Sequence, residues 1–462
     1  MLFNSIDFLF FFAFVIAVYY ALQKSWVSRK AFLLAASYFF YMMWNPPFVI
    51  LLWGSTLLDY VAGRRIASAD ATSTKKMWVL LSCLGNLGVL AFFKYGKFIV
   101  DNVWSVLPDG VAFPDFLNHV ILPMGISFYT FQSLSYTIDV YRDPKQVSHS
   151  FLDFALYVTF FPQLVAGPII RSSSFLPQLK NNHNATGDEV QRGIDLVMRG
   201  FAKKVLLADT LAIYVDQVYA MPEIYGAWNH LLAIYAYAFQ IYFDFSGYSD
   251  IAIGTALILG FKVPANFDLP YVARGPSDFW RRWHISLSTW LRDYLFISMG
   301  GSRVNPRKIY RNLVITMVLG GLWHGAAWGF VLWGAFHGLW LMIHRYVWRD
   351  HSGIKIPGWL SILGTFHLVC FAWIFFRAES ISDISVIIKQ FADFTMPIYS
   401  IPLDVLVCLA LGFLCHGLGA SQFLKDRWCN LNIVFKTWWY VALTIVIFFR
   451  FSGQTSFIYF QF

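Results

Sequence analysis

Charged side chains are scarce in this sequence of 462 residues. Asp, Glu, Lys and Arg together make up 13% of the chain, whereas soluble domains contain about 25%. Hydrophobic residues make up 58% and aromatic residues 19%, and the mean hydropathy is +0.55. This composition excludes a sizeable soluble domain and predicts a polytopic membrane protein. The net charge of +9 then reflects basic loops beside anionic membrane lipids, and it argues against a nucleic-acid partner.

Cysteine is also rare, and its spacing excludes the common cysteine-based sites. The five cysteines form no CxxC pair and mostly lie in apolar runs, so we expect free thiols, no disulfide framework and no metal site. The sequence also lacks a glycine-rich phosphate loop, a G-x-S-x-G elbow and a zinc signature. The N-terminal apolar run lacks a basic leader and a small-residue cleavage site, which predicts a retained first span. The cysteines are Cys83, Cys370, Cys408, Cys415 and Cys429.

Long apolar runs occupy most of the chain. A membrane-crossing helix needs about 20 apolar residues, so the runs predict one all-α domain, residues 1–462, with about 11 transmembrane helices. Several runs are short or interrupted by Gly and Pro, which predicts additional re-entrant and interfacial helices whose backbone is covered by protein or lines a cavity. The runs are 6–22, 31–44, 47–62, 77–93, 119–141, 151–170, 201–221, 228–260, 312–324, 325–347, 357–377, 401–420 and 436–451.

The distribution of Lys and Arg predicts the orientation of the chain. The loop after the first run carries Lys24, Arg29 and Lys30, and segment 262–311 carries nine basic residues against three Asp. Basic loops face the cytoplasm, so both are predicted to be cytoplasmic and the N-terminus outside. The loop 378–400 carries three acidic residues against one Lys, and we expect it outside.

One histidine lies in an apolar run without any charged residue. His324 is part of GGLWHGAAWG, within the run 313–341, which contains no Asp, Glu, Lys or Arg. Ionisable groups at membrane depth are costly and mark functional sites. The surrounding glycines and alanines let another backbone or a substrate come close. We therefore predict that His324 is the catalytic base of a membrane-embedded acyltransferase; a packing histidine bonded to a neighbouring helix is the alternative.

A second histidine lies in an aromatic, arginine-rich segment, SDFWRRWHISLSTWLR. The pattern predicts one helix at the inner leaflet, with Ser277 as its N-cap and Asp278 in its first turn. Trp280, His284 and Ser288 would then share one face. An interfacial anchor helix explains the Trp and Arg residues but not the histidine. Two imidazoles are enough for acyl transfer, because one accepts a proton from the attacking hydroxyl and the other steadies the oxyanion or orients the first.

The acyl donor is expected to be a thioester, which is already activated and needs no metal. The ADP part of coenzyme A is strongly anionic and suits the Arg-rich segment. Arg281 and Arg282 are therefore candidate contacts for coenzyme A, Trp323 is a further candidate, and we expect no permanently bound cofactor.

Further ionisable residues lie inside the predicted helices. His337 and His344 are seven residues apart and fall near one helix face; we prefer a packing role for them over a place in a tunnel. Asp244 and Asp250 are carboxylates in an apolar run, and they should pair with Arg or bond to backbone because buried charges need partners.

Together these motifs resemble a known family. RRWHISLSTWLRDYLF, followed about 40 residues later by GGLWHGAAWGFVLWGAFHG, resembles the membrane-bound O-acyltransferase (MBOAT) family and is most similar to its bacterial alginate O-acetyltransferase branch. LPMGISFYTFQSLSYTIDVYR, FPQLVAGPIIR and QIYFDFSGYSDIAIG extend the resemblance nearly end to end. The resemblance implies that His324 is the catalytic histidine and His284 the second signature position. It also implies a ring of helices around a central tunnel that is open to a cytoplasmic donor.

Residues 450–462 form an aromatic C-terminal tail that ends FSGQTSFIYFQF. An apolar tail packed against its own bundle is the simplest interpretation. The terminal F-x-Y-F-type motif, however, resembles one whose tyrosine is proposed to carry the acyl group in related bacterial systems, which makes Tyr459 a candidate acyl carrier. A phenol ester remains activated, so it can pass the group to a second enzyme outside.

The resemblance implies an O-acetyltransferase of the EC 2.3.1 class in the bacterial inner membrane. It would pass acetyl groups from cytoplasmic acetyl-CoA across the membrane for O-acetylation of an exported polysaccharide such as alginate or cellulose. A periplasmic partner of the SGNH-hydrolase type and other exopolysaccharide secretion components are the implied partners. The alternatives are transfer of another acyl group, such as D-alanyl, and a transporter or flippase of a lipid-linked sugar. The sequence shows no pair of matching broken helices, which argues against a transporter.

Overall fold

The computed structural model describes residues 1–107, 115–165, 167–347, 356–391, 393–419, 431–450 and 457–458, and every regular element in these ranges is helical. The all-α prediction is confirmed for this part of the chain. The four cysteines within it, Cys83, Cys370, Cys408 and Cys415, are free thiols as predicted. The chain divides into two compact units, Met1–Val197 with Ile251–Pro264, and Met198–Asp250 with Ala265–Phe462. The predicted single domain is not tested by this division.

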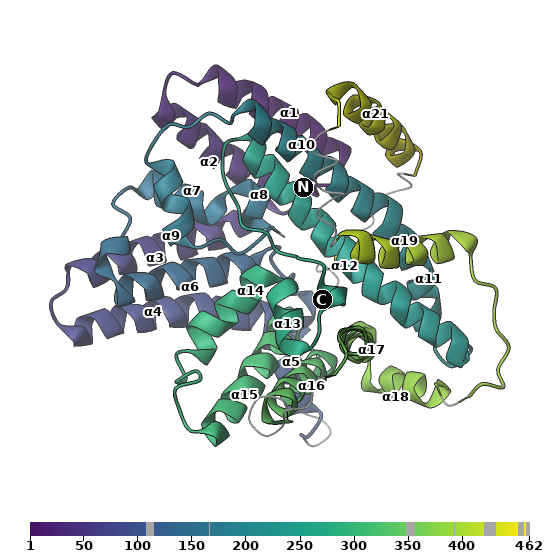
Figure 1. Cartoon of the computed structure of the whole chain (residues 1–462). Coiled ribbons are helices and arrows are strands. Elements are labelled where there is room, and N and C mark those ends of the chain that lie inside the picture. Colours follow the sequence, from purple (N-terminus) through teal and green to yellow (C-terminus); the bar gives the residue numbers. More distant parts are fainter. Residues whose placement is uncertain are drawn as a thin grey trace. The chain divides into compact units, whose positions relative to one another are not determined.

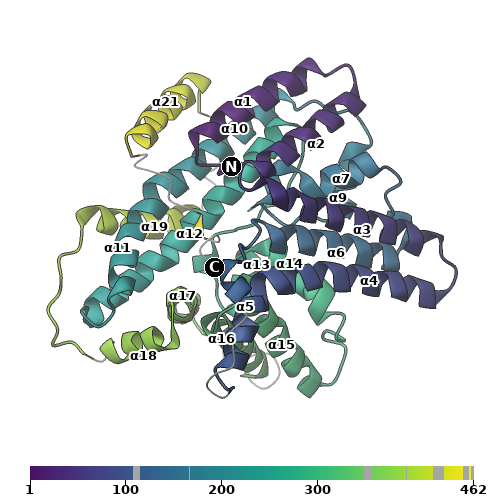
Figure 2. The same ribbon diagram turned by 180° about the vertical axis from the view of Figure 1, so that it is seen from behind.

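Most helices of the first unit overlap the predicted apolar runs, although several ends differ by five residues or more. In Figure 1 and, from behind, in Figure 2, α3, α4 and α6 lie side by side, and all three pack against one another. The elements are α1 (Ile6–Ala21), α2 (Trp26–Met42), η1 (Pro46–Phe48), α3 (Val49–Ser68), α4 (Thr72–Leu90), η2 (Ala91–Tyr95), α5 (Gly96–Trp104), η3 (Asp115–His119), α6 (Ile126–Arg142), η4 (Pro144–Gln146), α7 (Phe151–Thr159), α8 (Phe161–Leu164), α9 (Ser172–Phe175), η5 (Leu176–Leu179) and most of α10 (Gly187–Phe201).

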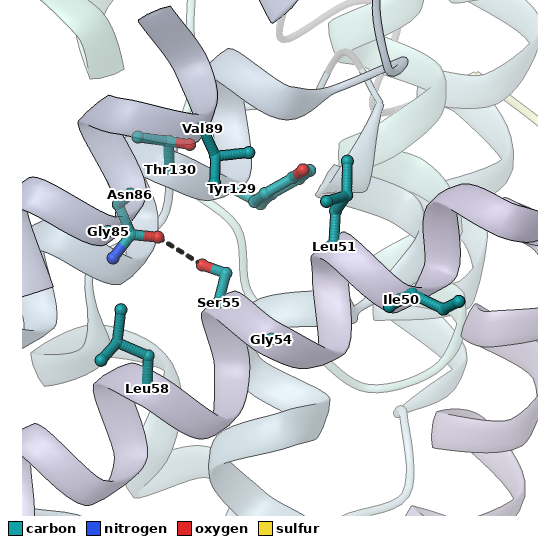
Figure 3. A pocket seen from close by; sticks show the side chains of 10 residues that line it. All are labelled: Ile50, Leu51, Gly54, Ser55, Leu58, Gly85, Asn86, Val89, Tyr129 and Thr130. Atoms are coloured by element: carbon teal, nitrogen blue, oxygen red, sulfur yellow. Dashed lines mark hydrogen bonds between the residues drawn. The ribbon is translucent and has the colours of Figure 1, made fainter. Parts of the chain in front are cut away.

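A buried carboxylate joins α3, α4 and α6. Asp59 accepts hydrogen bonds from the Ser82 hydroxyl, from Asn86 Nδ2 at 2.8 Å and from Thr137 Oγ1 at 2.9 Å. A cavity of about 170 Å³ lies beside this network (Figure 3). Ser55 and Asn86 both line it, and the Ser55 hydroxyl donates a hydrogen bond to Asn86 Oδ1. All residues that line the cavity belong to α3, α4 and α6, so it contains neither predicted catalytic histidine.

The second unit contains the described candidate site residues, Arg281, Arg282, His284, Trp323 and His324. The end of α10 and the residues of α12 up to Asp250 belong to it. The remaining elements are η6 (Ala202–Ala208), α11 (Asp209–Ala220), α12 (Ala227–Ile258), η7 (Pro270–Val272), α13 (Pro276–Arg282), α14 (Ile285–Trp290), η8 (Leu291–Phe296), α15 (Pro306–His324), α16 (Trp328–His344), α17 (Gly358–Arg377), α18 (Ile381–Gln390), α19 (Leu403–Gly419) and α21 (Ile433–Arg450).

Glycines bring α15 and α16 into backbone contact. The two helices run side by side (Figure 1). A Cβ atom on Gly321 would collide with the carbonyl oxygen of Phe330, and one on Gly334 would collide with that of Met317. Only glycine leaves room for this approach. The small residues therefore let another backbone come close, as predicted from the sequence. The close packing fixes the end of α15, where His324 lies.

Among the described residues, three helical stretches are long and apolar enough to cross a membrane: Thr72–Trp104, Gly358–Arg377 and Ile433–Arg450. Two shorter apolar helices are α1 and α19. The run predicted at 151–170 is broken, because α7 ends at Thr159 and α8 begins at Phe161, next to Pro162. The count of about 11 crossings and the position of the N-terminus outside stay predictions.

Candidate functional site

His324 is the last residue of α15 and is 3% exposed. The helix ends there because Gly325 is fully extended, with φ −163° and ψ 158°, and α16 begins three residues further on. A side chain at position 325 would collide with the ring of Phe330, so this short connection requires glycine. The imidazole is thus held at a buried junction between two tightly packed helices.

His284 does not lie inside a helix, which corrects the single helix predicted for this segment. α13 ends at Arg282, Trp283 is extended, and His284 has left-handed φ and ψ angles of 42° and 55°. α14 then begins at Ile285, so Trp280, His284 and Ser288 share no helix face. A non-glycine residue costs about 1–2 kcal/mol in this conformation, and such strain persists only where the surroundings hold it.

The start of the segment also differs from the prediction. Gly275 precedes the helix and Pro276 occupies its first position, so Ser277 lies within the first turn and is not the N-cap. Proline is well suited to that position because its missing N–H would have no partner there. Asp278 does lie in the first turn, as predicted.

Asn266 stabilises the break at His284. Its backbone carbonyl accepts the N–H of Ile285 at 2.9 Å, and its side-chain oxygen accepts the N–H of Ser286 at 3.2 Å and the Ser286 hydroxyl at 2.9 Å. These bonds satisfy the first amides of α14, which have no partner within the helix. The carbonyl of Arg282, at the end of α13, accepts the N–H of Asp268 at 2.9 Å. The 266–268 segment therefore caps both helices and fixes the His284 backbone.

The two histidines lie together in a buried aromatic cluster. Their ring centroids are 6.4 Å apart, and His284 is fully buried. Phe245 lies 4.6 Å from the His284 ring, and Trp323 lies 5.8 Å from it and 5.1 Å from the His324 ring. Trp333 and Phe376 each lie 5.1 Å from the His324 ring on its other sides.

This arrangement can support proton transfer at a small substrate group. A neutral imidazole accepts a proton from a hydroxyl, and a second polar group nearby can orient it or stabilise negative charge. Aromatic walls exclude water, which strengthens electrostatic interactions inside the site. The structure thus brings the two predicted histidines together, and their catalytic roles stay predictions.

The predicted coenzyme A contacts differ in how accessible they are. Arg281 has a 72% exposed side chain with one acidic neighbour, Asp278, at 3.6 Å. Arg282 is 29% exposed and pairs with Asp278 at 3.1 Å and Asp268 at 3.4 Å. Trp323 is 4% exposed and belongs to the histidine cluster. Arg281 is therefore the candidate with the most accessible charge, whereas Arg282 is held by two carboxylates. Within the described ranges, no three His, Cys, Asp or Glu side chains converge as metal ligands would.

Tyr459 lies outside the described residues, as does most of the predicted tail. Beyond Arg450, the last residue of α21, the described tail residues are Phe457 and Ile458, which are 0% and 2% exposed. Phe457 lies 4.3 Å from the ring of Tyr248 and 5.6 Å from that of Phe245. The interpretation of a tail packed against its own bundle is confirmed at these two positions.

The two carboxylates of α12, Asp244 and Asp250, have the partners that buried charges require. Asp250 pairs with Arg199 at 2.9 Å and with Lys203 at 2.7 Å. Asp244 pairs with Lys204 at 2.8 Å and accepts a backbone hydrogen bond at its other oxygen. The prediction of Arg or backbone partners is confirmed, with lysines added.

The roles of those lysines and of Phe245 were not predicted from the sequence. Lys203 and Lys204 did give a signal, because they lie in the apolar run 201–221 and a charged side chain there needs a partner of opposite charge. Phe245 gave no signal, because one more Phe in an aromatic run looks like any other core residue.

His337 packs as the sequence analysis preferred. It is fully buried, and its ring lies 4.8 Å from Trp333 and 5.2 Å from Trp280. Neither ring nitrogen forms a hydrogen bond within the described residues. His337 therefore offers a buried imidazole in the same aromatic surroundings as His324 but outside the histidine pair.

Comparison with known proteins identifies relatives of this chain. The sequence model of the membrane-bound O-acyltransferase family matches residues 9–381. The probable alginate O-acetylase AlgI of Pseudomonas aeruginosa is 44% identical, over 82% of this chain and 73% of that protein. The peptidoglycan O-acetyltransferase of Helicobacter pylori is 37% identical, over 96% and 86%. The teichoic acid D-alanyltransferase of Bacillus subtilis is 29% identical, over 57% and 70%.

These relatives transfer acyl groups, so they give the transporter alternative no support. The match runs from within α1 to the start of α18 and includes His284 and His324. The chain therefore belongs to the membrane-bound O-acyltransferase family and is an O-acyltransferase.

Proposed function

We propose that this protein takes acetyl groups from acetyl-CoA in the cytoplasm and passes them across the bacterial inner membrane for O-acetylation of an exported polysaccharide. The observation that carries the proposal is the buried pair of imidazoles, His284 and His324, with ring centroids 6.4 Å apart in an aromatic enclosure. The 44% identity to a probable alginate O-acetylase supports acetyl as the acyl group. Alginate or cellulose is the proposed polymer class.

The proposed chemistry uses His324 as the base. A hydroxyl oxygen attacks the thioester carbonyl carbon while His324 accepts the hydroxyl proton. His284, or a group that it orients, stabilises the negative charge that develops on the carbonyl oxygen. The carbon–sulfur bond then breaks, and the proton passes from His324 to the departing thiolate. The products are an acetyl ester and free coenzyme A, so all atoms and charges balance.

Tyr459 is the proposed first acceptor. Its phenol would form an aryl acetate that stays activated for a second transfer. A periplasmic enzyme of the SGNH-hydrolase type would then move the acetyl group to a polysaccharide hydroxyl. The buried positions of Phe457 and Ile458, the residues just before Tyr459 in the sequence, support a tail that enters the unit where both histidines lie.

Arg281 and Arg282 are the proposed contacts for the phosphates of coenzyme A, and Trp323 contributes to the wall near the thioester. Arg281 contributes more to phosphate binding than Arg282, because its side chain is 72% exposed and that of Arg282 is 29% exposed. Phosphate binding at such a site weakens as the salt concentration rises.

The test is incubation of the purified protein with isotope-labelled acetyl-CoA, followed by mass spectrometry of the C-terminal peptide. Label on Tyr459 is expected in the wild type, and His324→Ala should reduce its formation by about 100-fold or more, the range typical of a lost general base. Tyr459→Phe should remove the label completely. His337→Ala is the matched control, since it removes an equally buried imidazole and should leave labelling intact.

Other outcomes separate the parts of the proposal. Consumption of acetyl-CoA only after a periplasmic partner is added, with no label on Tyr459, would keep acetyl transfer and discard the carrier role. Full activity of His324→Ala would exclude His324 as the base. Turnover of a D-alanyl carrier protein in place of acetyl-CoA would assign the chain to the chemistry of the B. subtilis relative.

A further inference from the structure

We infer that the second unit contains a binding site for the protein's own C-terminal segment, in which the Lys204–Asp244 ion pair holds the backbone N–H of Ile458. The carboxylate of Asp244 is the centre of this site. Its Oδ1 atom lies 2.8 Å from Lys204 Nζ, and its Oδ2 atom accepts the Ile458 N–H at 2.8 Å. Each oxygen thus has a separate donor, one from η6 and one from the tail.

The ion pair is deeply buried, so the Asp244 carboxylate needs the hydrogen-bond donor that the tail supplies. The side chains of Lys204 and Asp244 are 2% and 4% exposed, and Lys204 also contacts Asp209 at 3.0 Å. A buried carboxylate oxygen without a donor is strongly unfavourable. When Ile458 leaves, the Oδ2 atom loses the donor that it has in this structure, so docking of the tail stabilises the charge cluster.

Gly247 lets α12 and η6 approach closely enough for the Lys204–Asp244 contact. A Cβ atom on Gly247 would lie 2.8 Å from the carbonyl oxygen of Gly200 and 3.2 Å from the amide nitrogen of Lys204. Because Gly247 has no side chain, α12 lies directly against η6. That approach lets the Lys204 ammonium reach Asp244, one turn away on the same helix as Gly247.

Apolar contacts complete the site. The Phe457 ring lies 4.3 Å from that of Tyr248, which stands one helical turn after Asp244. It also lies 5.6 Å from Phe245, and Phe457 and Ile458 are both buried. A hydrogen bond to a buried carboxylate gives the segment its register, and the aromatic contacts supply most of the apolar burial.

The site adjoins the histidine pair through Phe245. The ring of Phe245 touches Phe457 on one side and lies 4.6 Å from the His284 ring on the other. Docking therefore anchors the segment that immediately precedes Tyr459 in the sequence. The consequence for catalysis, that Lys204 and Asp244 are positioning residues for acyl loading, rests on the carrier role proposed above for Tyr459; the docking itself does not.

The experiment follows hydrogen exchange of the C-terminal peptide by mass spectrometry in full-length protein held in lipid nanodiscs. Asp244→Ala removes the acceptor and should speed exchange of the tail peptide by about tenfold or more, as expected when a buried segment becomes free to open. Ile458→Pro removes the donor, leaves both charges in place, and should likewise release the residues around it. Asp244→Asn keeps an acceptor oxygen and should give an intermediate rate.

Asp250→Asn is the matched control. Asp250 lies on the same helix and also pairs with cations of the second unit, Arg199 and Lys203, but within the described ranges it forms no hydrogen bond to the tail. Thermal unfolding of every variant shows whether the bundle survives. Faster tail exchange in Asp244→Ala and Ile458→Pro but not in Asp250→Asn supports the binding site. Unchanged exchange in folded Ile458→Pro overturns it.

Acetyl labelling, measured on the same samples, separates the two proposals. A tail that is released in Ile458→Pro and loses its label supports both docking and its role in loading. A tail that is released by the variants but carries no label even in the wild type leaves docking in place and removes the carrier. A released tail that still becomes labelled at the wild-type rate shows that docking does not position Tyr459.

Discussion

The backbone of His284 limits which side chains this position accepts. Its left-handed conformation is held by the bonds that Asn266 makes to Ile285 and Ser286. Asn tolerates left-handed backbone better than most residues because its short polar side chain bonds locally. Conformation and side-chain chemistry therefore contribute separately to the effect of a substitution at position 284.

We predict that His284→Asn is more stable than His284→Ala, by up to about 1–2 kcal/mol, the strain of a non-glycine residue in this conformation. The asparagine variant should also retain more acetyl transfer, because it keeps a polar group beside His324. Thermal unfolding and labelling with acetyl-CoA measure the two effects. Equal stability of both variants would show that the backbone at 284 rearranges freely.

Glu189 gives the first unit a defined acid response. The N–H of Thr186 donates to Glu189 Oε2 at 2.9 Å, and the N–H of Glu189 donates to the Thr186 hydroxyl at 3.2 Å, a reciprocal cap at the start of α10. The Thr186 hydrogen bond, opposed by burial and aided by Lys262 and His183, lowers the pKa of Glu189 from 4.5 to about 2.

A lowered carboxyl pKa means that the ionised form stabilises the fold. This contribution is complete above pH 4.5, the ordinary value, and disappears as the pH falls toward 2. We predict that Glu189→Gln lowers the melting temperature at neutral pH and flattens the loss of stability between pH 4.5 and 2. Melting curves across this range test it. A variant with the same acid dependence as the wild type would show that Glu189 is not the responsible group.

Helix packing shows which parts of the site the sequence could predict. The end of α15 at His324 could be predicted, because the signals for it, the apolar run and the glycines after it, lie next to His324 in the sequence. The break at His284 did not follow, since no Gly or Pro marks Trp283 or His284 and the capping bonds come from Asn266. The Lys204–Asp244 contact also joins residues far apart in the sequence, so its geometry depends on how the helices pack.

Backbone contact between α15 and α16 leads to a prediction for glycine substitutions. A Cβ atom at Gly334 would collide with the Met317 carbonyl oxygen and lie 2.9 Å from the Cα atom of Val318. We expect Gly334→Ala to destabilise the protein by about 1–3 kcal/mol, as overpacking does, and to lower acyl transfer by moving His324.

Gly364→Ala is the control for that substitution. Gly364 lies in α17, and a Cβ atom there would meet nothing within 4 Å. Alanine at an open helical position gains about 0.5–1 kcal/mol relative to glycine. Thermal unfolding should therefore move in opposite directions for the two variants. A loss of similar size in both would mean that helix packing around Gly334 is not the cause.

At the scale of the whole molecule, the charge distribution predicts how the chain is oriented. Segment 262–311 is predicted to face the cytoplasm and loop 378–400 the outside. Ser302 and Ser382 are exposed residues in these two segments. In a background without native cysteines, Ser302→Cys should react only with a membrane-permeant thiol reagent in intact cells. Ser382→Cys should react with an impermeant one. The reverse pattern would invert the predicted topology.

Lipid contact matters most for α21. Only 6% of this helix is buried within the protein, and we expect lipid to surround most of it. Its 18 residues span about 27 Å, close to the roughly 30 Å of bilayer hydrocarbon. Six residues, 451–456, connect α21 to the docked Phe457. A thicker or thinner bilayer changes the preferred tilt and depth of such a helix. We therefore expect that bilayer thickness, acting through α21, changes how firmly the tail is attached, so that the acyl-chain length of the lipids becomes an experimental control over it.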